Sequence, residues 1–377
     1  MNYETLLKEL DKYPDTMTDE ERACAYAAGQ IVDRIPMNLC GYGEPQAGLF
    51  GYTMGEYRRS AKVQLDVWTR TREEFGIGNV VAAMDLNLRG MGEALGSKVV
   101  SPENSFEYID DHYLKDYAQL DSLEFEPETN AVIQRYVSNA KDMLELCGGK
   151  CPVVVNICGP MSTAIAIRKP EKFLRDLGKD KKNAHKLLQF GVDCNLKLLR
   201  YAKKEFGSIG VGLCDPATAA TLISYRNFLE FSKPYMDKLN KGIAEVTGTM
   251  PGIHICGKTK PLWNDLIELG YPAFSVDNCE DLAELKEAVG DKMAISGNVS
   301  PADVMRLGTP DDVIESVKQC LTKCADNPCG YTLDIGCQLP MGSPRENIMA
   351  YVYAARRFGR GAQKGKLPAG LYEEGVV

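Results

Sequence analysis

The chain has 377 residues, of which 44% are hydrophobic and 25% charged, a composition typical of a globular protein with a large buried core. Its net charge of −8 excludes an overall attraction to nucleic acid or to an anionic membrane surface, and no apolar stretch is long enough to span a bilayer. Thirteen scattered cysteines and an N-terminus without a signal-peptide pattern predict a cytoplasmic protein with reduced thiols.

The two ends of the chain differ from its middle. Residues 1–30 are polar and amphipathic, and Thr18 followed by Asp-Glu-Glu is a typical helix start, so we expect an N-terminal helical extension. Residues 361–377 contain Gly, Lys and Pro and predict a loosely attached C-terminal tail.

Between these ends, short β-like runs alternate with longer helical stretches. The runs are Ile35–Cys40, Asn79–Met84, Pro152–Cys158, Ile209–Cys214, Gly252–Cys256, Ala273–Val276, Met293–Ser296 and Tyr331–Ile335. Helical periodicity appears in Tyr57–Phe75, Glu171–Leu199, Asn227–Ala244, Pro261–Leu269, Asp281–Val289 and Asp311–Cys320.

This alternation predicts parallel βαβ units, and eight runs predict a single α/β barrel of the (β/α)8 type over residues 31–360. The long segment between the second and third runs predicts additional helices. A doubly wound sheet is the alternative, but no GxGxxG motif opens a helix after the first run.

His254 and Cys256 stand two residues apart at the end of an apolar run. In an extended strand, residues i and i+2 point to the same face, so both side chains can aim at one point. An imidazole and a thiolate, joined by a distant third thiolate such as Cys337, are ligands that zinc takes in a catalytic site with an open fourth position. A buried strand that merely carries His and Cys is the alternative.

A barrel places its active site at the carboxyl ends of its strands. The residues that close the predicted runs are Cys40, Asp85, Gly159-Pro160, Asp215, His254 and Cys256, Asp277, Gly297-Asn298 and Gly336-Cys337. Acids, metal ligands and glycine dominate this set, which strengthens the prediction of a metal site.

Among these residues we predict catalytic roles for Asp85, Asp215 and Asp277, and cofactor binding by Gly159 and Asn298. Asp85 and Asp215 could instead be helix N-caps, and Gly159 could belong to a simple turn. Three further cysteines are expected to be small buried apolar residues, namely Cys40, Cys158 and Cys214.

Cys320 and Cys324 lie four apart on a predicted amphipathic helix, a spacing that favours core packing over a second metal site with Cys329. We expect His112 on a surface segment and His185 on a solvated helix face.

Several short motifs resemble the uroporphyrinogen decarboxylase superfamily in order along residues 31–360. They are Val32-Asp-Arg-Ile-Pro, Glu93-Ala-Leu-Gly, Gly159-Pro-Met-Ser, Asp215-Pro, Gly297-Asn-Val and Gly336-Cys-Gln-Leu-Pro followed by Ser343-Pro-Arg-Glu-Asn. The resemblance implies a single (β/α)8 barrel, the same fold that the eight runs predict.

Within that superfamily, His-x-Cys with a late cysteine is similar to the zinc- and corrinoid-dependent methyltransferases of the methylcobamide:coenzyme M type. The resemblance implies that His254, Cys256 and Cys337 bind Zn²⁺, with Asp277 in the fourth position when substrate is absent. It implies transfer of a methyl group between a corrinoid and a small substrate, either a thiol or a methoxylated compound.

The corrinoid, a cobalamin, is expected to arrive on a separate protein. Carriers of this kind show Asp-x-His-x-x-Gly, and the only approximation here, Asp110 to Lys115, lacks the glycine. The expected partners are therefore a corrinoid protein and a small methyl donor or acceptor, with no nucleic acid and no membrane. Tyr42, Phe50, Tyr52 and Arg89 are available to line a substrate slot.

A lyase of the decarboxylase type and a non-catalytic zinc- or corrinoid-binding barrel are the alternatives. True decarboxylases resemble one another in an arginine-rich N-terminal segment, whereas here no arginine follows Arg34 until Arg58, and their late Gly-His is Gly336-Cys337. The lyase would be favoured if the arginines at 34, 58, 59 and 89 all pointed into the barrel mouth.

Overall fold

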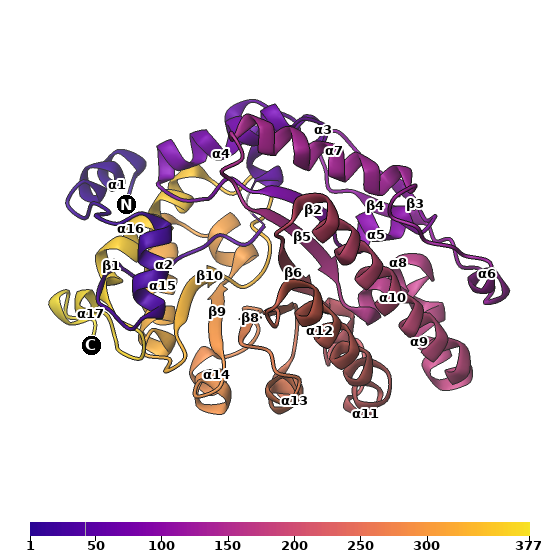
Figure 1. Ribbon diagram of the computed structural model, residues 1–377. Helices are drawn as coiled ribbons and strands as arrows, with labels where there is room; N and C mark the ends of the chain where they lie inside the picture. The colour runs from indigo at the N-terminus through magenta and orange to yellow at the C-terminus, as the bar shows by residue number, and fades with distance from the viewer. Residues whose placement is uncertain (42) are drawn as a thin grey trace.

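The computed structural model describes residues 1–41 and 43–377 (Figure 1). Seven parallel strands form the central sheet in the order β10-β9-β8-β7-β6-β5-β2. Their bounds are β2 Ala82–Leu86, β5 Val153–Cys158, β6 Gly210–Cys214, β7 Ile253–Ile255, β8 Ala273–Val276, β9 Ala294–Val299 and β10 Tyr331–Ile335. Helices surround this sheet, and the fold is the predicted (β/α)8 barrel.

The first barrel position differs from the prediction. Instead of a strand over Ile35–Cys40, only Met37 forms a parallel bridge, to Leu333 of β10. Pro36 has no N–H to give to a ladder, and the N–H of Cys40 bonds the side chain of Asp334 at 2.9 Å instead. The segment therefore follows β10 without building a regular strand.

The barrel helices lie where periodicity predicts them, although two predicted helices are each divided. Ser60 ends α3 (Met54–Arg59) and caps α4 (Ala61–Phe75), while Asp180 separates α9 (Pro170–Lys179) from α10 (Lys181–Phe206). Short polar side chains that bond backbone N–H groups favour such breaks. The remaining barrel helices include α8 Pro160–Ile167, α12 Lys233–Thr247, α13 Trp263–Glu268, α14 Leu282–Val289, α15 Pro310–Cys324 and α16 Arg345–Phe358.

The long insertion between β2 and β5 carries the predicted additional helices and also a hairpin that was not predicted. Its helices are α5 (Leu88–Ala94), α6 (Ala118–Asp121) and α7 (Ala131–Leu146). Strands β3 (Lys98–Val100) and β4 (Tyr108–Asp111) pair antiparallel between them.

The N-terminal extension contains the predicted helices, α1 (Tyr3–Leu10) and α2 (Asp19–Ala27), and Thr18 and Glu21 form a capping box. After it, β1 (Val32–Arg34) pairs with β11 (Arg360–Ala362), so both ends of the chain meet at one side of the barrel (Figure 1).

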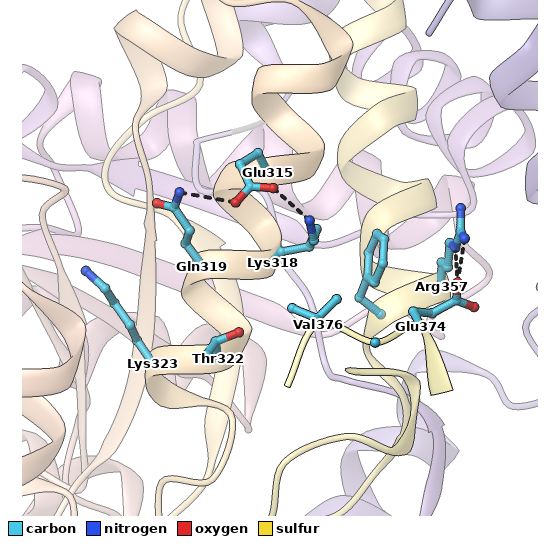
Figure 2. A pocket seen from close by; sticks show the side chains of 10 residues that line it. Glu315, Lys318, Gln319, Thr322, Lys323, Arg357, Glu374 and Val376 are labelled. Carbon is cyan, nitrogen blue, oxygen red and sulfur yellow. Dashed lines mark hydrogen bonds and ion pairs between the residues drawn. The ribbon is translucent and has the colours of Figure 1, made fainter. Parts of the chain in front are cut away.

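The expectation of a loosely attached C-terminal tail is wrong. Ala362 and Leu371 are fully buried, and α17 (Ala369–Glu373) packs beside α16. Figure 2 shows the groove between α15, α16 and this tail, where Arg357 and Glu374 form an ion pair 2.5 Å long. Apolar contacts and this ion pair thus hold the C-terminal tail against the barrel, although its composition predicts a solvent-exposed segment.

None of the helices in the described part of the chain combines the length and the apolar character needed to cross a membrane.

Candidate metal centre

Three predicted ligands meet at the carboxyl end of the barrel. Nε2 of His254 lies 3.0 Å from Sγ of Cys256, and that sulfur lies 3.2 Å from Sγ of Cys337. The ligand atoms of the three residues all lie within 4.8 Å of one another. Strand β7 supplies His254, Cys256 directly follows it, and Cys337 comes from the loop after β10.

The orientation of His254 is fixed from the neighbouring strand. His254 is in register with Ser275 of β8, and its Nδ1 lies 3.0 Å from Oγ and 3.2 Å from the carbonyl oxygen of that serine. With Nδ1 engaged, Nε2 is the nitrogen that faces the sulfurs. Such an outer hydrogen bond is the usual way in which a metal-binding histidine is held.

One hydrogen bond joins the sulfurs of Cys256 and Cys337. The bond from Cys256 and the imidazole of His254 lower the pKa of Cys337, although burial opposes this change. The same bond and burial raise the pKa of Cys256. Burial opposes the charged form of His254, yet its hydrogen bond with Cys337 raises its pKa. One imidazole and two cysteine sulfurs are a donor set that fits a zinc ion with an open position.

Two glycines bring the loops close to the ligands. Gly257 has a φ of +84°, a conformation that an L-residue rarely adopts, immediately after Cys256. Gly336 is needed for space, because a Cβ there would lie 2.4 Å from the backbone N of Asn278.

Asp277 shapes this part of the site but is not in the ligand group. Its two carboxylate oxygens accept from the N–H groups of Gly257 at 2.8 Å and Cys279 at 2.9 Å. Each oxygen that accepts one backbone N–H keeps a second lone pair, so the fourth ligand position stays a prediction for Asp277.

Asp85 ends the barrel-facing side of β2 and remains open to solvent. Its carboxylate accepts from the side-chain amide of Asn87 at 2.9 Å. Although part of the carboxyl reaches solvent, the protein atoms packed around it disfavour its charged form. This desolvation, with repulsion from Glu44 as the next cause, raises the pKa of Asp85 to about 6. This carboxyl stands where the prediction placed it, at the barrel mouth.

Asp215, for which a catalytic role is predicted, contacts Ser162 of α8. The residue is fully buried and accepts from the backbone N–H and the hydroxyl of Ser162 at 2.8 and 2.6 Å. Burial raises its pKa to about 6. It holds the first turn of α8, an earlier helix, and its side chain makes no capping bond to the short helix that it opens at Pro216, so the predicted N-cap is not observed. The catalytic role of Asp215 stays a prediction.

Gly159 makes room for this same contact. A Cβ at Gly159 would lie 2.3 Å from a carboxylate oxygen of Asp215, so only glycine leaves room for that buried side chain. The cofactor-binding role of Gly159 stays a prediction.

Asn298 holds a loop. Its amide donates to the carbonyl oxygens of Asp277 at 3.1 Å and Glu280 at 2.8 Å, across the turn that follows β8. Because its donor capacity is used there, the contacts support the loop beside the metal ligands and give no evidence for cofactor binding.

Sequence reasoning missed Asp334, a carboxylate that is 3% exposed inside the barrel. It accepts from the N–H of Cys40 at 2.9 Å, from the amide of Asn38 at 3.1 Å and from the hydroxyl of Ser296 at 3.2 Å. The signal was available, since a charged residue interrupts the apolar run Tyr331–Ile335.

The other cysteines and histidines lie mostly as expected. Cys320 and Cys324 are buried on α15, and Cys158 and Cys214, in register on β5 and β6, have sulfurs 3.6 Å apart. Cys40 and Cys214 are only half-buried. His185 is packed more closely than expected, with its ring stacked on Phe231 at 4.6 Å.

The arginines do not converge on the mouth. Arg34 is 2% exposed and pairs with Asp15 of the N-terminal extension, and Arg59 pairs with Glu103 on the surface. Arg58 pairs with Glu44 at 2.6 Å. The condition that would have favoured the lyase is thus not met.

Tyr42, predicted for the substrate slot, lies outside the described residues.

Comparisons with known proteins agree on a family. A family model described as uroporphyrinogen decarboxylase (URO-D) matches residues 18–358. A methylated-thiol–coenzyme M methyltransferase from Methanosarcina mazei is 26% identical over 90% of this chain and 89% of its own length. A methylcobamide:CoM methyltransferase from Methanosarcina barkeri is 26% identical over 57% of this chain and 60% of its own length.

A solved structure of a methyltransferase from Methanosarcina mazei shares the fold. It superposes with a TM-score of 0.72 at 23% identity, covering 91% of this chain and 99% of that one. With a family model that spans most of its length and relatives that are methyltransferases, this chain belongs to the uroporphyrinogen decarboxylase family.

Proposed function

We propose that the protein is a zinc-dependent methyltransferase that moves a methyl group between a corrinoid and a small substrate, such as a thiol or a methoxylated compound. The observation that carries this proposal is the convergence of His254, Cys256 and Cys337 at the barrel mouth. The relatives support it, since one is a methylcobamide:CoM methyltransferase and another acts on methylated thiols.

His254, Cys256 and Cys337 would hold the zinc ion. When bound, zinc supplies a Lewis acid that keeps a substrate thiol deprotonated, or that polarises a leaving group, at neutral pH. The two cysteines have a further effect on reactivity, because their negative charge offsets that of the cation and leaves a substrate sulfur electron-rich.

The other residues of the mouth position and shield these ligands. Ser275 keeps Nε2 of His254 directed at the sulfurs, and Asp277 holds the turn at Gly257. Asp334 ties Asn38 and Cys40 to β10, next to the loop that carries Cys337. Asp85 stands open to solvent at the end of β2, where a small substrate can reach it.

The corrinoid would be delivered by a separate protein. The open carboxyl end of the barrel is where its reactive face must approach, because the three ligands lie there. We do not propose decarboxylation, since Arg34 and Arg59 are held by carboxylates away from the ligands.

Metal analysis combined with a methyl-transfer assay tests the proposal. We expect about one zinc per chain and demethylation of methylcobalamin in the presence of a thiol, with both lost in His254→Ala. Freshly prepared protein that holds no stoichiometric metal would contradict it. A protein that binds zinc and methylcobalamin without turnover would be the non-catalytic barrel.

A further inference from the structure

Arg89 is a guanidinium at the barrel mouth that faces the ring of Phe106 but whose N–H donors have no acceptor among the described residues. It is half-buried in the first turn of α5, four residues after Asp85, and in the described part of the chain its side chain makes no hydrogen bond and no ion pair. The other buried or half-buried arginines of the described residues all have ion pairs, namely Arg22, Arg34, Arg58, Arg168, Arg345, Arg356, Arg357 and Arg360. A half-buried cation without a partner is costly, so its free donors point to a ligand.

Two carboxylates share this place with Arg89. The charges of Arg89 and of the half-buried Glu107 both act on Asp85, and no ion pair joins Arg89 to Asp85 among the described residues. Among the described residues Glu107 has no hydrogen-bond partner, and Asp85 accepts only from Asn87. The N–H donors of Arg89 and the oxygens of Glu107 are therefore available to a ligand.

The nearby Glu44 is paired with a different arginine. Its carboxylate is bound by Arg58, whose Nε and Nη2 lie 2.9 and 2.6 Å from Oε1, and Arg58 also bonds the carbonyl oxygen of Pro102 at 2.7 Å. Arg58 thereby fixes the loop that carries Phe106, and Phe106 lies under Arg89 with 5.8 Å between guanidinium carbon and ring centre. The candidate binding site therefore combines the Phe106 ring, whose loop Arg58 holds, with the guanidinium of Arg89 and the carboxylates of Asp85 and Glu107.

This place belongs to the same mouth as the metal ligands. Asp85 ends β2, and Cys337 follows β10, which flanks the Met37 segment at the point where the barrel closes. Asp85 and the three ligands thus stand at the same carboxyl end of the barrel, so a small molecule held at Arg89 and Asp85 would be on the side of the metal centre.

We propose that Arg89 and the pair Asp85 and Glu107 bind a zwitterionic head group, in which Arg89 takes a carboxylate and the two acids take an ammonium. This inference rests on the proposed function and names its substrate class, which is an amino acid that carries a thiol as methyl acceptor or an N-methylated amino acid as methyl donor. A purely anionic head group would meet Arg89 but would be repelled by the two acids.

Binding measured by calorimetry on the zinc-loaded protein tests the head group directly. L-homocysteine and glycine betaine are the two zwitterionic probes, cysteamine carries only the ammonium, and 3-mercaptopropionate carries only the carboxylate. Arg89→Gln should lower the affinity for homocysteine, betaine and mercaptopropionate by about tenfold or more, because a charge-assisted hydrogen bond to the carboxylate is lost. The affinity for cysteamine, which has no carboxylate, should not fall. Asp85→Asn should lower the affinity for homocysteine, betaine and cysteamine, which carry a cationic nitrogen, but not for mercaptopropionate.

Two variants serve as controls. Arg89→Lys keeps the charge and should restore part of the loss, whereas Arg175→Gln removes an exposed arginine on α9 and should change nothing. Circular dichroism confirms that each variant is folded. Binding of betaine but not homocysteine would identify a methyl donor, and the reverse would identify an acceptor.

Equal effects of Arg89→Gln on cysteamine and mercaptopropionate would overturn the inference, as would tighter binding of 2-mercaptoethanesulfonate than of homocysteine. The methylcobalamin assay separates this inference from the proposed function. Head-group discrimination without methyl transfer would contradict only the function, and methyl transfer to thiols of any head group would contradict only the inference.

Discussion

Cys337 reaches the other ligands from a loop, 81 residues after Cys256. If it is a zinc ligand, Cys337→Ser should lower zinc content sharply while the barrel stays folded, because a hydroxyl is a poor substitute for a thiolate. The measurement is zinc per chain after dialysis, with circular dichroism for the fold. Cys329→Ser is the matched control, and equal zinc retention in the two variants would mean that the third ligand lies elsewhere.

Ser275 offers a second test at the scale of one side chain. Removing its hydroxyl leaves the His254 ring less firmly oriented, so Ser275→Ala should weaken zinc binding by about ten- to a hundredfold without loss of the fold. Competition with a chromophoric chelator measures the change. Ser296→Ala, which alters the in-register serine on the next strand, should leave zinc affinity nearly unchanged, and an equal effect would contradict the role of Ser275.

Among the elements, α2 and β1 are joined by a buried charge network. Arg22 is 1% exposed and binds Asp33 through Nε at 2.6 Å and Nη2 at 2.9 Å. Despite the opposing effect of burial, this pairing and the N–H groups of Thr16 and Met17 lower the pKa of Asp33 to about 2. Asp33 thus acts beside other contacts that hold the N-terminal extension on the barrel, among them Asp15 with Arg34 and Arg356 and the buried Leu6 and Leu10.

The replacement Asp33→Asn should therefore destabilise the protein by about 2 kcal/mol at neutral pH. Because the pKa of Asp33 is lower in the folded state, its contribution is complete above about pH 4 and is lost as the pH falls toward 2. Urea unfolding at several pH values should show the variant losing less stability than the wild type over that interval. Asp237→Asn, which breaks an exposed ion pair with Lys241, should change stability little at any pH.

Elements with strong local patterns were predictable from the sequence, and contacts between distant segments were not. The bounds of β8 and β10 match the predicted runs residue for residue. The first strand was wrong because Asp334, 294 residues away, takes the N–H of Cys40. The ligands could be found through the His-x-Cys spacing, whereas Ser275 is an ordinary strand serine whose role depends on the register of β7 and β8.

For the whole molecule, the C-terminal tail is part of the fold. Leu371 is fully buried and its neighbour Tyr372 is 59% exposed, so the two positions form a matched pair. Leu371→Ala should lower the free energy of unfolding by about 2–5 kcal/mol through a cavity, while Tyr372→Ala should change it by about 0.5 kcal/mol or less. Denaturant titration measures both, and similar values for the two variants would contradict a packed tail.

The single bridge at Met37 has a consequence for how the barrel moves. Ladders join the seven strands from β2 to β10, but within the described residues the Met37 segment forms no strand pairing with β2. The cylinder is thus a rolled sheet with one seam. Separating the Met37 segment from β2 disrupts side-chain packing but breaks no strand pairing, so we expect local opening of the barrel to begin there. Asp85 stands on one lip of the seam, and Cys40 lies on the other.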